Sequence, residues 1–212
     1  MRDSWMTLRG VLPAVGNQSP GHRFFSSCEK EGKTMRIGKL ALGLTGLAVG
    51  YALTRASSPQ IPQGIVPVKP FDLTRYMGKW YEVARLENRF ERGLTRTAAE
   101  YSLNSDQTVK VVNRGFDPWK GRWTQATGTA RFVRSPDEGA LKVSFFGPFY
   151  GGYNIVDIDE GGYRWSIVVG STRSYFWVLS REPEASQELK ARAVAQALLL
   201  GINPGALLWV PQ

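Results

Sequence analysis

The residues best suited to chemistry in this chain are four carboxylates near the ends of predicted strands: Glu87, Glu91, Asp157 and Asp159. Two carboxyl groups in one site can act as a general acid and a general base. Acidic side chains at strand ends, however, are mostly solvated and take no part in a reaction. We therefore predict no catalytic residues.

The chain is also poor in the side chains that bind metals or act as nucleophiles. Its single histidine and single cysteine are His22 and Cys28, and from Glu29 onward it has neither an imidazole nor a thiol. This excludes disulfides, His or Cys metal sites, a cysteine nucleophile and the Ser-His-Asp mechanism in that region. The pair Gly151-Gly152 is not a phosphate loop, because it lacks the lysine and the following helix. We predict no metal and no cofactor.

The strands that would carry these residues follow from short alternating apolar runs separated by Gly, Pro, Asn and Asp, which supply turn dihedrals. We expect strands at residues 78–86, 97–103, 108–116, 122–133, 140–145, 150–157, 163–169 and 175–180. Eight short antiparallel strands with tight connections predict an all-β fold, an up-and-down barrel with room for one small ligand. A β-sandwich is the alternative.

An amphipathic helix is expected at about Glu184 to Leu200, with Gly201 as its cap and Pro204 forbidding continuation. Its apolar residues recur at spacings of three and four, which predicts packing on the outside of the barrel. These residues are Leu189, Ala193, Val194, Ala197 and Leu200.

The net charge of +9 is concentrated at the N-terminus. Residues 1–60 contain eight Lys or Arg and three acids, so +5 lies there and +4 in the other 152 residues. Targeting segments have this distribution. We predict no nucleic-acid partner, because no basic stripe or known module is present.

A signal-peptide pattern follows, with a basic start at residues 35–39 and an uncharged run over Leu40–Leu53. The run is shorter than the ~20 residues that a spanning helix needs. Arg2, Arg9 and Arg23 leave an organelle-targeted eukaryotic protein as an alternative. The predicted organisation is a leader at 1–64, made of an extension at 1–34, a signal or anchor at 35–56 and a linker at 57–64, then a domain at 65–212.

Two motifs connect the ends of the strand series to a known family. Gly78-Lys79-Trp80-Tyr81 opens the first strand after a short helical turn at residues 72–76, and Ser180-Arg181-Glu182-Pro183 ends the last. This order resembles the lipocalin family, from about Ile65 to the C-terminus. Three stretches are similar to bacterial outer-membrane lipocalins in particular: 80–85, 88–93 and 141–154.

The resemblance implies a structural floor formed by Gly78, Trp80 and Arg181, with Trp80 plugging the closed end and Arg181 packed across it. In the first strand, periodicity favours Tyr81 and Val83 as the apolar face. The resemblance instead places the alternate set inward, and we follow it, expecting the terminal helix to cover Tyr81 and Val83. The inward set is Trp80, Glu82, Ala84 and Leu86.

Aromatic and small residues are expected to surround a ligand cavity. The fourth strand has a face of mainly small residues, which would leave open volume: Ala126, Gly128, Ala130 and Phe132. Phe90 in the first long loop could act as part of a lid, and Arg89 or Arg92 could meet an anionic head group. The expected lining and mouth residues are Ala84, Leu86, Phe90, Ala99, Tyr101, Val111, Asn113, Gly128, Val143, Phe145, Tyr153 and Trp177.

The resemblance implies non-enzymatic binding, storage or transport of fatty acids and lysophospholipids at the bacterial cell envelope, by a monomer or homodimer. The expected location is the periplasm or the periplasmic face of the outer membrane, with membrane association through the leader. Many such lipocalins have a lipidated Cys after the apolar run. This chain has Tyr51-Ala52-Leu53-Thr54 there, so lipid anchoring is not expected. The alternatives are a lipid-modifying enzyme and a structural envelope protein with a filled barrel.

Overall fold

The computed structural model describes residues 61–212. The predicted extension, the signal or anchor segment and the start of the linker lie outside the described residues. Within residues 61–212, no helix is long and apolar enough to cross a membrane.

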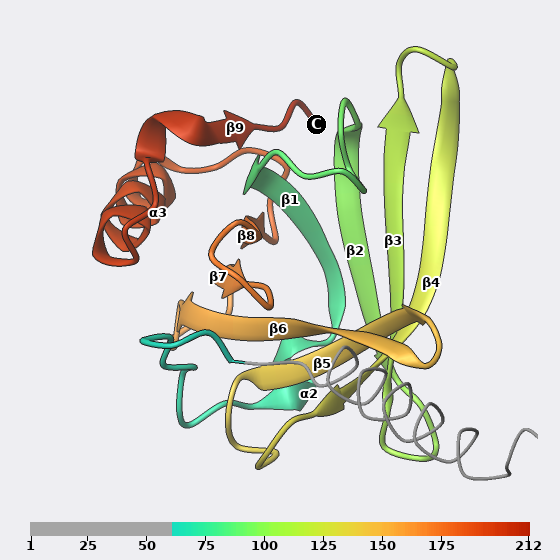
Figure 1. Ribbon diagram of the computed structural model, residues 1–212, viewed down its shortest axis with the longest axis vertical. Coiled ribbons are helices and arrows are strands. Elements are labelled where there is room, and N and C mark those ends of the chain that lie inside the picture. Colours follow the sequence, from blue (N-terminus) through green and yellow to red (C-terminus); the bar gives the residue numbers. More distant parts are fainter. Residues whose placement is uncertain (1–60) are drawn as a thin grey trace, which may run out of the picture. The chain divides into compact units, whose positions relative to one another are not determined.

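Eight antiparallel strands form a closed barrel (Figure 1). Each strand pairs with the next in sequence, and β8 and β2 both pair with β1, which closes the sheet. The predicted fold class is therefore confirmed. The strands are β1 Gly78–Leu86, β2 Thr95–Leu103, β3 Val109–Asp117, β4 Arg122–Phe132, β5 Ala140–Phe146, β6 Phe149–Ile158, β7 Trp165–Val169 and β8 Phe176–Ser180.

The seventh strand begins two residues later than the sequence pattern predicts. Tyr163 has a left-handed backbone with φ of 53°, and its N–H donates to the Asp159 carbonyl at 2.7 Å. Such a conformation belongs to a turn rather than a strand. The Tyr163 hydroxyl instead accepts from the Asp72 N–H at 2.9 Å, which ties this turn to the start of helix α2, Leu73–Tyr76.

Helix α3, Gln187–Leu199, packs on the outside of the barrel as predicted. The Ser186 hydroxyl accepts from the Leu189 N–H at 3.1 Å and so starts the helix three residues later than expected. Leu189, Ala193 and Ala197 are buried, whereas the predicted apolar residue Val194 is exposed.

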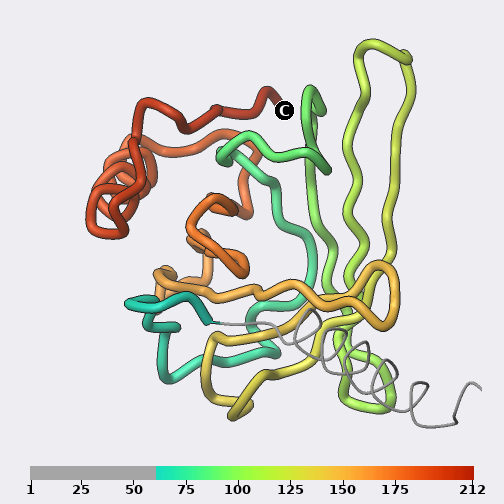
Figure 2. Tube along the Cα trace, viewed as in Figure 1, coloured from blue at the N-terminus to red at the C-terminus, as the bar shows by residue number. Residues whose placement is uncertain are grey.

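The chain then turns through η1, Pro204–Ala206, into a ninth strand that the sequence pattern did not predict, β9 Leu207–Trp209. This strand pairs antiparallel with the end of β1, and the C-terminal segment runs beside β1 in Figure 2. The Val210 N–H also donates to the Val83 carbonyl at 3.0 Å.

Two separate apolar cores result from the alternation of side chains along the strands. The inner core lies inside the barrel and contains Trp80, Tyr101 and Val111. The outer core lies between the barrel wall and α3, and Val83 contributes to it, with Tyr81 packed against it. The inner core is the one that can form a ligand site.

Candidate functional site

The closed end of the barrel is sealed by an indole under a guanidinium. The Arg181 guanidinium carbon lies 3.8 Å from the centroid of the buried Trp80 ring. The Trp80 Nε1–H donates to the Tyr76 carbonyl at 2.8 Å. Arg181 donates to the backbone carbonyls of Lys79 at 2.7 Å and Met77 at 2.9 Å. Because its charged side chain donates hydrogen bonds to several backbone carbonyls, Arg181 holds the chain in place at the closed end of the barrel.

Gly78 is needed at this floor for its backbone conformation. Its φ is 94°, a region that residues with a Cβ rarely adopt. A Cβ there would lie 3.4 Å from Nη1 of Arg181. The expected floor residues Gly78, Trp80 and Arg181 therefore lie together.

Above the floor, three tyrosine hydroxyls meet inside the barrel. The hydroxyls of Tyr76 and Tyr153 are 2.7 Å apart, and those of Tyr153 and Tyr101 are 2.9 Å apart. The Tyr76 hydroxyl also donates to Ser166 at 3.2 Å. Burial raises the pKa of Tyr76 to about 12, so the group is an uncharged hydrogen-bonding cluster.

Burial of the inward side chains falls off from the floor toward the mouth. Near the floor, Val109, Ala130 and Leu141 are buried. Residues of the same inner core that lie higher in the barrel are only partly buried. Five of the predicted lining residues belong to this partly buried group: Ala99, Val143, Phe145, Tyr153 and Trp177. The barrel is therefore packed at its closed end, and solvent reaches its apolar wall farther up.

Asn113 faces the same space and has an unsatisfied atom. It pairs with Ala99 of β2 and with the exposed Ala126 of β4. Within residues 61–212, its Oδ1 is buried without a hydrogen-bond partner. A buried acceptor of this kind is costly unless water or a ligand donates to it.

A β-bulge in the first strand corrects the expected positions of Ala84 and Leu86. The pairs between β1 and β8 are Glu82 with Leu179, Ala84 with Val178 and Arg85 with Trp177. Val83 is the extra residue, and side chains beyond a bulge change face. Ala84 and Leu86 therefore pack in the outer core, and Arg85 faces inward in their place.

Arg85 is fully buried, and its hydrogen bonds connect the barrel wall to the first long loop, residues 87–94. Its Nη1–H donates to Glu82 Oε1 at 2.8 Å. Its Nη2–H donates to the carbonyls of Glu91 at 2.9 Å and Leu94 at 3.1 Å. The Thr97 hydroxyl also donates to Glu82 Oε1, at 3.2 Å. The loop is therefore held over the barrel by a buried charged residue.

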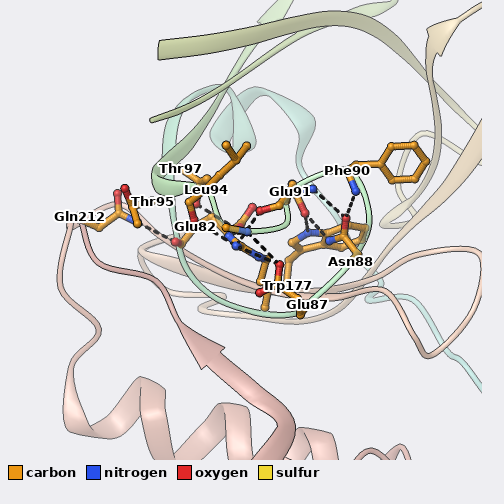
Figure 3. Close-up of polar contacts among 12 residues, drawn as sticks. Glu82, Glu87, Asn88, Phe90, Glu91, Leu94, Thr95, Thr97, Trp177 and Gln212 are labelled. Carbon is orange, nitrogen blue, oxygen red and sulfur yellow. Dashed lines mark hydrogen bonds and ion pairs between the residues drawn. The ribbon is translucent and has the colours of Figure 1, made fainter. Parts of the chain in front are cut away.

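The side chain of Glu91 turns inward from the same loop (Figure 3). Its Oε2 accepts from Nε1 of Trp177 at 2.9 Å and from Nδ2 of Asn88 at 2.5 Å. Burial raises the pKa of Glu82 to about 8, and the nearby negative charge of Glu91 adds to the increase, whereas Arg85 opposes it. Both carboxyl groups serve to position the loop.

Aromatic rings lead from this loop into the barrel. Phe90 is 65% exposed and stacks on Tyr175 at 6.5 Å between centroids, and Tyr175 stacks on Trp177 at 5.9 Å. The Arg89 guanidinium lies 4.6 Å from the Phe90 ring centroid. Arg92 is exposed on the same loop. The loop thus presents one exposed ring and two cations at the mouth.

The space that a side chain on Gly128 would take is filled by β5, so the small residue does not leave open volume in that direction. A Cβ on this residue would lie 2.6 Å from the Ser144 carbonyl oxygen and 2.9 Å from the Phe145 ring. The glycine instead allows β5 to approach β4 closely. These strands pair only over Thr129–Phe132, and a hollow of about 530 Å³ opens beside Gly128 where the pairing stops.

Sequence reasoning missed the role of Arg85 and the pairing of Glu91 with Trp177. An arginine in an apolar strand was a signal, but only the bulge shows which face it occupies. Within the described part of the chain, no group of three or more His, Cys, Asp or Glu side chains could hold a metal ion.

Comparison with known proteins agrees with this geometry. Residues 71–212 match the family model described as a lipocalin-like domain. The chain is 46% identical over 162 residues to the outer membrane lipoprotein Blc of Escherichia coli K12, covering 76% of this chain and 91% of the relative. It is 32% identical over 153 residues to temperature-induced lipocalin-1 of Arabidopsis thaliana, covering 68% and 81%.

Among solved structures, the fold is similar to that of the cockroach allergen Per a 4. The TM-score is 0.57 at 24% identity, and the match covers 74% of this chain and 96% of the allergen. Insecticyanin from the tobacco hornworm Manduca sexta also has a TM-score of 0.57, at 20% identity, with 73% and 87% covered. The family match over most of the chain, together with the closed barrel and its floor, shows that this chain belongs to the lipocalin family.

Proposed function

We propose that the protein binds long-chain fatty acids or lysophospholipids inside its barrel and stores or carries them without catalysing a reaction. The observation that carries the proposal is the gradient of burial inside the barrel. The floor at Trp80 is sealed, while apolar side chains higher up, such as Val143 and Phe145, remain accessible to solvent. An acyl chain would cover this apolar wall.

The gain from covering it is large enough to drive binding. Each buried methylene contributes about 0.8 kcal/mol, so a chain of ~16 carbons gives on the order of 12 kcal/mol before entropic costs. Asn113 and the tyrosine hydroxyls offer few polar contacts along this path, which suits a ligand recognised mainly by its apolar chain. Arg89 and Arg92 at the mouth suit an anionic head group.

A non-catalytic role fits the state of the interior carboxyl groups. Glu82 accepts from Arg85 and Thr97, and Glu91 accepts from Asn88 and Trp177. Groups engaged in this way position a loop and are not free to transfer a proton to a ligand. The lipid-modifying enzyme is therefore the less favoured alternative, and a filled barrel is disfavoured by the accessible wall.

We place the protein at the bacterial cell envelope, in the periplasm or on the periplasmic face of the outer membrane, as a monomer or homodimer. Relatives from Escherichia coli, Citrobacter freundii and Vibrio cholerae carry the name outer membrane lipoprotein. Residues 35–56 would direct export. A fusion of residues 35–64 to a periplasmic reporter should be active, and retention of the reporter in the cytosol would contradict this location.

The binding proposal is tested by extracting lipid from the purified full-length chain and by native mass spectrometry. We expect a co-purified single-chain lipid, and displacement of a fluorescent fatty acid by added lysophospholipid. Trp177→Ala should change the affinity for the probe by roughly tenfold, because the indole lines the upper wall. Trp209→Ala, on β9 outside the barrel, is the matched control.

Equal affinity of wild type and Trp177→Ala for the probe would show that Trp177 does not contact the ligand. Absence of both co-purified lipid and probe binding in folded wild-type protein would overturn the proposal and favour a structural role.

A further inference from the structure

The hairpin of β3 and β4 projects beyond the end of the neighbouring strand β2 (Figure 1). β3 pairs with β4 along its whole length, from Val109 with Ala130 to Asp117 with Arg122. The four-residue connection is held by Asp117, whose Oδ1 accepts from the N–H groups of Trp119 and Lys120, both at 3.1 Å. The tip is therefore an ordered structure.

Large aromatic side chains are exposed at this tip. Trp119 is 92% exposed and Trp123 is 57% exposed. The Trp123 ring packs edge-on against Phe116, its partner across the hairpin, at 5.7 Å between centroids. A tryptophan this exposed contributes little to folding, and exposed apolar clusters commonly mark interaction surfaces.

The side chains around these rings are mainly basic. Exposed cations at the tip, on the adjoining loop and at the start of β2 are Arg92, Arg96, Lys120 and Arg122. The loop adjoins the tip, because a Cβ at Gly93 would lie 3.8 Å from Nε1 of Trp119. Among residues 61–212, only Lys120 of these four cations forms an ion pair, with the buried Asp117 at 2.9 Å. The one exposed acid on the loop is Glu87, which lies 3.7 Å from Arg85.

We propose that the β3–β4 tip docks the protein on an anionic lipid bilayer, with Trp119 and Trp123 in the interface and the surrounding cations against the head groups. Tryptophan prefers the boundary between head groups and acyl chains, because its ring is apolar and its N–H is polar. Lysine and arginine near the surface are attracted to anionic lipids. A projecting, ordered hairpin can reach a flat surface that the barrel wall cannot.

This inference goes beyond the proposed lipid binding in the barrel and does not depend on it. Docking would place the mouth loop beside the surface from which a lipid is taken or to which it is delivered. A chain that docks but contains no lipid would refute the proposed function and leave this inference intact.

The test uses the full chain with a fluorophore sensitive to polarity at the tip. Cys28→Ser removes the only cysteine, and Lys120→Cys or, as a second site, Gln125→Cys carries the label. The matched control is Leu199→Cys, on the outer face of α3, where the side chain is 79% exposed. Vesicles contain phosphatidylcholine alone or an equal mixture with phosphatidylglycerol.

We expect the emission of the tip label to shift to shorter wavelength with the phosphatidylglycerol vesicles, while the label at position 199 does not change. Trp119→Ser should raise the lipid concentration needed for half of this shift by roughly tenfold. Arg122→Gln should raise it more than Arg131→Gln, which lies at the other end of β4. Circular dichroism confirms that each variant is folded.

Three results would overturn the proposal. These are no shift at either tip label, equal shifts at the tip and at position 199, or a shift that grows with protein concentration in the absence of vesicles. The last result would identify a second copy of the chain as the occupant of the tip.

Discussion

Replacing Glu82 with glutamine should make the stability of this protein less dependent on pH. Glu82 is buried inside the barrel, where it accepts from Arg85 Nη1 and the Thr97 hydroxyl and lies close to Glu91. The glutamine oxygen can keep both hydrogen bonds, and its amide can donate toward Glu91. The substitution therefore mimics the protonated carboxyl group at every pH.

The size of the effect follows from the pKa of Glu82, which burial raises from 4.5 to about 8. Between these values the folded protein binds more protons than the unfolded chain, so the free energy of unfolding decreases as pH rises. The contribution of Glu82 is complete below pH 4.5 and is lost as pH passes through about 8. The total loss is about 5 kcal/mol, at about 1.4 kcal/mol for each pH unit.

Urea unfolding of wild type and Glu82→Gln between pH 5 and pH 9 measures this directly, since urea does not change the ionic strength. As pH rises from roughly 5.5 to 7.5, the free energy of unfolding of wild type should fall relative to that of Glu82→Gln by about 1.4 kcal/mol per pH unit. Glu100→Gln, at an exposed position on β2, is the control and should run parallel to wild type.

Parallel curves for wild type and Glu82→Gln across this range would refute the reasoning. They would mean that Glu82 is already ionised in the folded protein at pH 5, with Arg85 outweighing burial and Glu91. This conclusion holds whether the parallel curves coincide or the variant is less stable than wild type by a constant amount.

Two further substitutions test the floor and the close approach of β4 and β5. Trp80→Ala should lower the free energy of unfolding by roughly 3–5 kcal/mol in urea titrations, because it removes a fully buried ring and the contact with Arg181; a thermal melt like that of wild type would contradict this. Gly128→Ala should cost roughly 1–3 kcal/mol, since the new Cβ would meet the Ser144 carbonyl. Gly151→Ala has room for its Cβ and should change stability little, so equal losses at both glycines would exclude crowding as the cause.

The strands and the outer helix could be predicted because their signals are local. Alternation along β5 and the three-to-four spacing of Leu189, Ala193 and Ala197 each depend on a few adjacent residues. The ninth strand could not be predicted in this way. Its three residues, Leu207–Trp209, are too few to show a period, and they are ordered by pairing with β1.

The site was less predictable, because one bulge decides which residues line it. A shift of one residue moves every later side chain to the other face of a strand. Ala84 and Leu86 therefore left the predicted lining and Arg85 entered it. The role of Gly128 could not be predicted either. A glycine in a strand can leave an empty space or allow two backbones to approach closely, and the sequence does not distinguish the two.

The seam between β1 and β8 has a consequence for how the barrel forms. Arg181 donates to the carbonyl of Lys79, a residue 102 positions earlier, and its guanidinium lies over the Trp80 ring. During synthesis the first strand emerges long before its partner, so one of its edges stays open while six more strands are made. Pairing over such separations is slow, and open edges invite association with other chains. If the chain crosses a membrane before it folds, β1 waits for β8 on the far side of that membrane. Completing the barrel there depends on factors that protect the open edge of the unfinished sheet.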